Sequence, residues 1–198
     1  MSLATMIYIV SGLPRSGTSL MMQMLAAGGL PIVTDGLRQS DENNPRGYYE
    51  WERIKRLAQE PSCVAEAEGR VVKVISSHLF ALPAQHDYRV LFMLRPIEEV
   101  VASQAAMLQR LRTKGPALEA SMMAAALKAH LAQTNAWLDR QPPIRTHRVE
   151  YHSLLREPLA QAKAIAGFLE APLDVAAMAA QVDVGLYRQR GAANTGDL

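Results

Sequence analysis

Cysteine is the scarcest residue type in this chain, which has only Cys63 among its 198 residues. A single cysteine cannot form an internal disulfide, and no Cys or His pair with zinc-ligand spacing lies near it, so the sequence argues against a disulfide scaffold and a zinc site. We interpret Cys63 as a small buried hydrophobe. This cysteine usage is typical of a reducing compartment, and we expect a cytoplasmic protein.

The sequence also lacks long apolar runs and strongly charged segments. No stretch is long enough to span a bilayer, and no basic segment precedes the short apolar run near the N-terminus, so we expect neither a membrane span nor a signal peptide. The formal net charge is only +2 and no Lys/Arg run is present, which argues against a nucleic-acid partner. With 49% apolar residues, the chain can bury one sizeable core, and we expect a single domain over 1–198.

Strand and helix patterns alternate along the chain. Short apolar runs predict strands over 6–10, 32–33, 70–75, 89–94 and 144–150, and helical patterns cover 18–27, 50–59, 159–169 and 173–181. Two longer helices follow Pro96 and the Gly115-Pro116 break. Apolar spacing predicts their buried faces as Ile97, Val100, Val101, Gln104, Leu108 and Leu111, and as Leu118, Met122, Leu127, Leu131, Thr134 and Leu138. This alternation predicts an α/β fold, a doubly wound parallel sheet flanked by helices.

The most specific motif is a glycine-bounded loop between the first predicted strand and the first predicted helix. Gly12 and Gly17 have the spacing of the G-x-x-x-x-G-K-[ST] nucleotide loop, whose backbone N–H groups surround an anion at a helix N-terminus. Where that motif has lysine, this chain has Thr18, so the cation of the loop must be Arg15. The sequence therefore predicts a P-loop NTPase-like anion site at the carboxyl ends of the strands.

A magnesium nucleotidase of this kind also needs an apolar strand that ends in Asp, which holds the metal. The best buried strand of this chain, 89–94, is followed by Arg95 instead. A cation at that place favours a second anion over a metal ion, and we expect no metal in the site.

Three segments in the same order resemble the sulfotransferase family. The segment Pro14-Arg15-Ser16-Gly17-Thr18-Ser19 is similar to the family's 5′-phosphosulfate loop. Arg95 and Ser103 have the spacing of its 3′-phosphate motif, an Arg at a strand end and a Ser in the following helix. The segment from Val149 to Leu155 resembles the family's Tyr-Glu-Asp-Leu region. The resemblance extends over most of the chain.

This resemblance implies 3′-phosphoadenosine 5′-phosphosulfate as the sulfuryl donor. The donor-binding residues would then be Gly12, Pro14, Arg15, Ser16, Gly17, Thr18, Ser19, Arg95, Ser103 and Tyr151. Two separated anionic groups suit two cationic sites, and fixed donors and side-chain cations can stabilise the leaving phosphate without a metal. Cytosolic members stack adenine on a tryptophan where this chain has Leu20, so that wall of the base pocket is unexplained. Tyr151 could contact adenine or could be a buried tyrosine at a strand end.

The resemblance also suggests catalytic residues, Glu50, Arg15, Lys73 and His78. Arg15 would contact the leaving phosphate, and Lys73, within an apolar strand, would either do the same or extend to solvent. Glu50 is the first candidate for the base, although a glutamate in a first helical turn also complements the helix dipole. His78 is the competitor, but Lys73 lies five residues before it, whereas cytosolic members have Lys-Thr-His-Leu.

Two other functions stay open at this point. A P-loop kinase or nucleotidase would use ATP and Mg²⁺, and a non-catalytic protein of the same fold would bind the nucleotide without turnover. The acceptor hydroxyl or amine could belong to a small molecule, a glycan or a peptide. The exposed helix faces are compatible with a homodimer as well as with a monomer.

Overall fold

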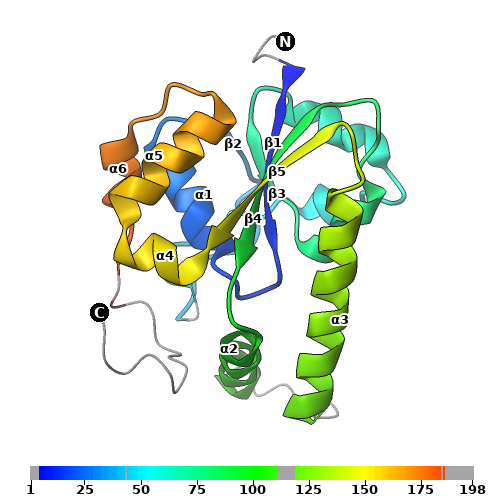
Figure 1. Cartoon of the computed structure of the whole chain (residues 1–198), viewed down its shortest axis with the longest axis vertical. Helices are drawn as coiled ribbons and strands as arrows, with labels where there is room; N and C mark the ends of the chain where they lie inside the picture. Colours follow the sequence, from blue (N-terminus) through cyan, green and yellow to red (C-terminus); the bar gives the residue numbers. More distant parts are fainter. Residues whose placement is uncertain (1–4, 43, 111–118, 184, 186–198) are drawn as a thin grey trace.

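A five-stranded parallel sheet with the order β2-β3-β1-β4-β5 forms the centre of the computed structural model (Figure 1). The structure describes residues 5–42, 44–110, 119–183 and 185. The strands are β1 Ile7–Gly12, β2 Ile32–Val33, β3 Val71–Lys73, β4 Tyr88–Leu94 and β5 Ile144–Glu150. Each expected strand is present, but β3 ends at Lys73 because the chain turns into a 3₁₀ helix at Ser76.

Helices connect the strands on both faces of the sheet. They are α1 Thr18–Ala27, α2 Ile97–Arg110, α3 Ala120–Leu138, α4 Tyr151–Arg156, α5 Pro158–Leu169 and α6 Val175–Ala179. In the part of the chain that the structure describes, 3₁₀ helices also lie at Glu52–Arg56, Pro61–Ala67 and Ser76–Ala81. The helical segment expected over 50–59 is therefore a short 3₁₀ helix, in which Ile54 N donates to Trp51 O at 3.1 Å. The doubly wound α/β fold is confirmed.

The side chains of β1 alternate between two hydrophobic cores. Tyr8 and Val10 pack in the core that contains α1, α4, α5 and α6. Ile7 and Ile9 pack in the opposite core, together with the 3₁₀ helices and the C-terminal end of α3. Because both faces of the strand are covered, it has a continuous apolar sequence instead of an alternating one.

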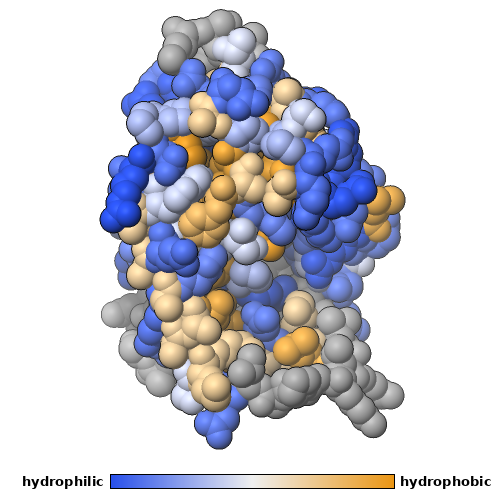
Figure 2. Space-filling model, turned by 90° about the vertical axis from the view of Figure 1, so that its right-hand side faces the viewer, coloured by the Kyte–Doolittle hydropathy of each residue, from blue (hydrophilic) through white to orange (hydrophobic). Residues whose placement is uncertain are grey.

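The predicted buried faces of α2 and α3 are partly wrong. Leu108 is 37% exposed and Met122 is 58% exposed, and the predicted positions Leu111 and Leu118 lie outside the described residues. The reason is that α3 extends beyond the sheet, so that its N-terminal half packs against α2 and Leu13 instead of the sheet (Figure 1). Only Thr134 and Leu138 of α3 are buried. On the face that carries α3, hydrophobic and hydrophilic residues are intermixed (Figure 2).

Two predictions from composition can be compared with the structure directly. Cys63 is 1% exposed, and burial raises the pKa of its thiol, as expected for a structural cysteine. Among the described residues, no helix is both long enough and apolar enough to cross a bilayer.

The strand order brings two distant segments together. β1 pairs with β4 in parallel, with Gly12 opposite Met93, so the loop after Gly12 and the residue after Leu94 emerge side by side at the same edge of the sheet. In open α/β sheets this carboxyl edge is where ligands bind.

Candidate anion-binding site

The loop between β1 and α1 has a backbone that favours glycine at two positions. Gly12 and Gly17 have φ angles of 145° and 100°. A Cβ atom on Gly12 would lie 2.8 Å from the Met93 carbonyl oxygen. Arg15 also has a positive φ of 72°, which is uncommon outside glycine and is typical of strained functional loops. The loop thus forms a tight cradle in front of α1.

Two hydroxyl groups at and before the cradle have no hydrogen-bond partner among the residues that the structure describes. The hydroxyl oxygens of Ser11 and Ser16 are buried without a hydrogen bond. Gly17, which precedes α1, provides no side-chain cap, so the N–H groups of the first helical turn are available to a ligand. Buried unpaired hydroxyls are costly.

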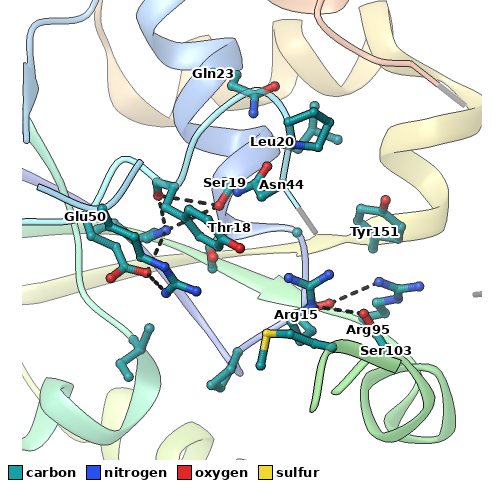
Figure 3. A pocket seen from close by; sticks show the side chains of 18 of the residues that line it. Arg15, Thr18, Ser19, Leu20, Gln23, Asn44, Glu50, Arg95, Ser103 and Tyr151 are labelled. Carbon is teal, nitrogen blue, oxygen red and sulfur yellow. Dashed lines mark hydrogen bonds and ion pairs between the residues drawn. The ribbon is translucent and has the colours of Figure 1, made fainter. Parts of the chain in front are cut away.

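Arg15, Arg95 and Ser103 come together from three parts of the chain (Figure 3). Arg15 Nε donates to Ser103 Oγ at 3.0 Å, and Arg95 donates to the Arg15 carbonyl oxygen at 3.1 Å. Burial lowers the pKa of the Arg15 guanidinium, which still leaves an arginine charged at neutral pH. The three residues predicted to hold two separate anionic groups are therefore neighbours in one site.

Tyr151, the first residue of α4, covers the cradle from the side of β5. Its side chain is buried, and a Cβ atom on Gly17 would lie 2.5 Å from its ring. The Arg95 guanidinium carbon is 4.8 Å from the ring centroid, within cation–π range. Burial raises the pKa of the Tyr151 phenol. Tyr151 is thus buried at the strand end and also lines the cleft, and its contact with adenine stays a prediction.

Lys73 is the last residue of β3 and is only 6% exposed. Its ammonium donates to the Tyr48 carbonyl oxygen and to Ser19 Oγ, the latter at 3.3 Å, and lies 3.9 Å from a Glu50 oxygen. Burial lowers the pKa of Lys73 to about 8, although Glu50 acts in the opposite direction. The alternative that Lys73 extends to solvent is therefore wrong.

Glu50 is surrounded by cations. Its carboxylate accepts from Arg38 at 2.6 Å and pairs with Lys55 at 3.4 Å, in addition to Lys73. The carboxylate is 17% exposed and borders the cleft. The Glu50 carbonyl oxygen accepts from Thr34 Oγ1 at 2.9 Å. Glu50 thus joins the loop before it to the strand that carries Lys73.

His78, the second candidate for the base, is half-buried in the 3₁₀ helix Ser76–Ala81. It borders the same cleft as Glu50. Burial lowers its pKa, and the nearby Lys55 lowers it further. A neutral imidazole at physiological pH can accept a proton.

One cleft of about 350 Å³ connects these groups. The predicted site residues that line it are Pro14, Arg15, Gly17, Thr18, Ser19, Glu50, Lys73, His78, Arg95, Ser103 and Tyr151. Gly12 lies beneath the loop, and Ser16 is 1% exposed. Among the described residues, no group of three or more His, Cys, Asp or Glu side chains could hold a metal ion.

Sequence reasoning missed several residues of the cleft. Arg38 lies over the Tyr48 ring, 3.5 Å from its centroid, and the Tyr48 hydroxyl donates to Asp41 at 2.7 Å. Both Arg38 and Tyr48 belong to the irregular segment between β2 and the first 3₁₀ helix, and its length was the only signal of a role. Glu99, which pairs with Arg95, and His152, which contacts Glu99, do not line the cleft and were missed as well, because they belong to no motif that names them.

A model of the family described as the sulfotransferase domain matches residues 7–184. This chain belongs to the sulfotransferase family. Its fold is similar to that of the sulfotransferase domain from the curacin biosynthetic pathway, with 18% identity and a TM-score of 0.50, and the match covers 97% of this chain and 80% of that one. Its fold is similar to that of the sulfotransferase domain from the Synechococcus PCC 7002 olefin synthase, with 20% identity and a TM-score of 0.50, and the match covers 97% of this chain and 80% of that one. It is also similar to sulfotransferase STF9 from Mycobacterium avium, with 12% identity and a TM-score of 0.55, and the match covers 96% of this chain and 70% of that one. A search of curated proteins gave no significant match. At these identities the solved structures support the fold, whereas the family model supports membership among sulfotransferases.

Gly17 of this sulfotransferase offers a test of the cradle, because Gly29 is a matched control. Both glycines have positive φ angles, 100° and 92°, but a Cβ on Gly29 would meet nothing within 4 Å. Gly17→Ala and Gly29→Ala should both lose about 1–2 kcal/mol of unfolding free energy from backbone strain. Gly17→Ala should lose about 1–3 kcal/mol more because it overlaps Tyr151. Urea unfolding measures the difference, and equal losses would contradict the packing described here.

Proposed function

We propose that this sulfotransferase moves a sulfuryl group from 3′-phosphoadenosine 5′-phosphosulfate to a hydroxyl or amine acceptor. The observation that supports this most is the convergence of Arg15, Arg95 and Ser103 in one cleft. We assign one anion site to the loop with Arg15 and a second to Arg95 with Ser103. A donor with phosphate at the 3′ position and phosphosulfate at the 5′ position has charges to match both.

The residues of the cradle fit the 5′ end of this donor. The unpaired Ser16 hydroxyl and the N–H groups at the start of α1 would bind the 5′-phosphate. Arg15 and the buried Lys73 would lie beside the bridging oxygen between phosphorus and sulfur. Arg95 and Ser103 would bind the 3′-phosphate.

In the proposed reaction the acceptor oxygen or nitrogen attacks sulfur in line with the bridging oxygen. The bond between sulfur and the bridging oxygen breaks, and its electron pair stays on the departing adenosine 3′,5′-bisphosphate. The acceptor proton passes to a base, for which we propose Glu50. Arg15 and Lys73 would stabilise the negative charge that develops on the leaving phosphate.

The choice between ATP and the phosphosulfate donor is tested by binding and transfer together. Isothermal titration calorimetry in EDTA should show tight binding of adenosine 3′,5′-bisphosphate, because the proposed contacts involve no metal. Labelled sulfuryl should pass from the donor to members of a panel of hydroxyl and amine acceptors. Binding of ATP·Mg²⁺ in place of the bisphosphate would indicate a kinase or nucleotidase. Tight bisphosphate binding without transfer to any acceptor would indicate a non-catalytic protein.

The base is tested by comparing Glu50→Gln with His78→Gln. Loss of a general base lowers kcat by about 10²–10⁴-fold. We expect this loss in single-turnover transfer by Glu50→Gln, and a much smaller change in His78→Gln. The reverse pattern would assign the base to His78, which also borders the cleft.

The pKa of Lys73, about 8, predicts how activity depends on pH. Below this pH the ammonium is charged and can stabilise the leaving phosphate, and above it the charge is lost. The kcat/KM for the donor, which reports on the free enzyme, should therefore fall as the pH rises through about 8. Lys73→Arg should abolish the fall because a guanidinium stays charged. Lys128→Arg, on the exposed surface, should keep it, and an unchanged fall in Lys73→Arg would exclude Lys73 as its cause.

A further inference from the structure

The buried Glu99 and the half-buried His152 form a chain of contacts that ends on Arg95. We propose that these two residues are positioning residues, which fix the Arg95 guanidinium in the orientation that binds the 3′-phosphate of the donor. The inference rests on the proposed function, because that function assigns Arg95 to this phosphate. Neither Glu99 nor His152 lines the cleft itself.

The first contact is an ion pair within one turn of chain. Arg95 Nε donates to Glu99 Oε2 at 2.9 Å, and the two side chains are 8% and 3% exposed. Another edge of the guanidinium donates to the Arg15 carbonyl oxygen at 3.1 Å, and one face lies near the Tyr151 ring. Two edges and one face of the guanidinium plane are therefore fixed by the protein before any ligand binds.

The second contact is made to the same carboxylate. His152 Nε2 forms a hydrogen bond with Glu99 Oε2 at 3.2 Å and lies 3.0 Å from Glu99 Oε1. A carboxylate that is almost fully buried needs polar partners, because an unpaired buried charge is costly. Without His152, Glu99 would turn towards other donors and would no longer hold Arg95 in the same orientation.

The fold explains why α4 provides two of the supporting side chains, Tyr151 and His152. β5 lies next to β4, and the chain turns from the end of β5 directly into α4, whose first two residues are Tyr151 and His152. One of these packs on the guanidinium face, and the other binds the carboxylate behind it. The segment that follows β5 thus supports Arg95 through both of its first two residues.

Fixing Arg95 affects binding because an arginine has many rotamers. A mobile arginine loses that freedom when a phosphate binds, which reduces the affinity. A guanidinium that is already oriented forms its charge-assisted hydrogen bonds without this loss. The expected effect is specific to the 3′-phosphate, since the 5′-phosphate binds at the loop.

The experiment measures an affinity ratio by calorimetry, adenosine 3′,5′-bisphosphate against adenosine 5′-monophosphate. In the unmodified protein the bisphosphate should bind about 10–100 times more tightly, as expected for charged hydrogen bonds. His152→Leu should lower this ratio by about threefold to tenfold and leave the monophosphate affinity unchanged. His152→Gln, whose amide can donate to Glu99, should restore most of the ratio. Glu99→Gln should lower the ratio at least as far as His152→Leu.

His147→Leu is the matched control, because His147 is also half-buried, stacks on Phe168 and does not line the cleft. The ratio of bisphosphate affinity to monophosphate affinity should be the same in this variant as in the unmodified protein. A folded His152→Leu protein with an unchanged ratio would overturn the positioning role, and so would equal losses of affinity for both nucleotides. If the unmodified protein did not discriminate between the nucleotides, the assignment of Arg95 in the proposed function would fail, and this inference with it.

Discussion

The parallel pairing of β1 with β4 is the constraint on which the site depends. It places the end of β1 beside the end of β4, so that Arg15 and Arg95, 80 residues apart in sequence, share a hydrogen bond. That bond connects the main chain of the loop to the side chain that we assign to the 3′-phosphate. The distance between the two proposed anion sites is therefore set by the spacing of neighbouring strands, about 4.7–4.9 Å, and by the reach of one arginine. A shift of β4 by one residue would separate them.

The cleft concentrates positive charge in a place where water is partly excluded. Each buried cation described here has an anionic or carbonyl partner, Glu99 for Arg95 and Tyr48 O with Glu50 for Lys73. For Lys73 these partners do not fully offset the loss of hydration, because burial still lowers its pKa to about 8. A ligand that brings negative charge would supply what is missing. The buried Ser16 hydroxyl of the loop, which has no hydrogen-bond partner among the described residues, also favours a ligand with hydrogen-bonding groups.

Much of this arrangement could be predicted from the sequence, because it depends on local patterns. A strand covered on both faces has a continuous apolar sequence, and a loop with positive φ angles needs glycines, so β1, Gly12 and Gly17 were predictable. Arg95 could be found because it directly follows such a strand. The parallel order of the strands then brought these residues together without further information.

What could not be predicted depends on which side chains meet across the fold. His152 is one of five histidines, and nothing in the sequence indicates that it reaches Glu99. The ion pairs of Glu50 join residues from three segments, which no local pattern reports. The exposure of Met122 shows the same limit, because apolar spacing predicts the face of a helix but not how far the sheet extends beneath it.

The position of Glu50 beside Lys73 has a consequence for the proposed reaction. Before transfer, the carboxylate partly neutralises the ammonium 3.9 Å away. When Glu50 takes the acceptor proton, its negative charge disappears, while negative charge develops on the bridging oxygen of the donor. Lys73 can then interact with the leaving group instead of the base. Negative charge would thus move from one side of Lys73 to the other, with no new buried charge created and little reorganisation required.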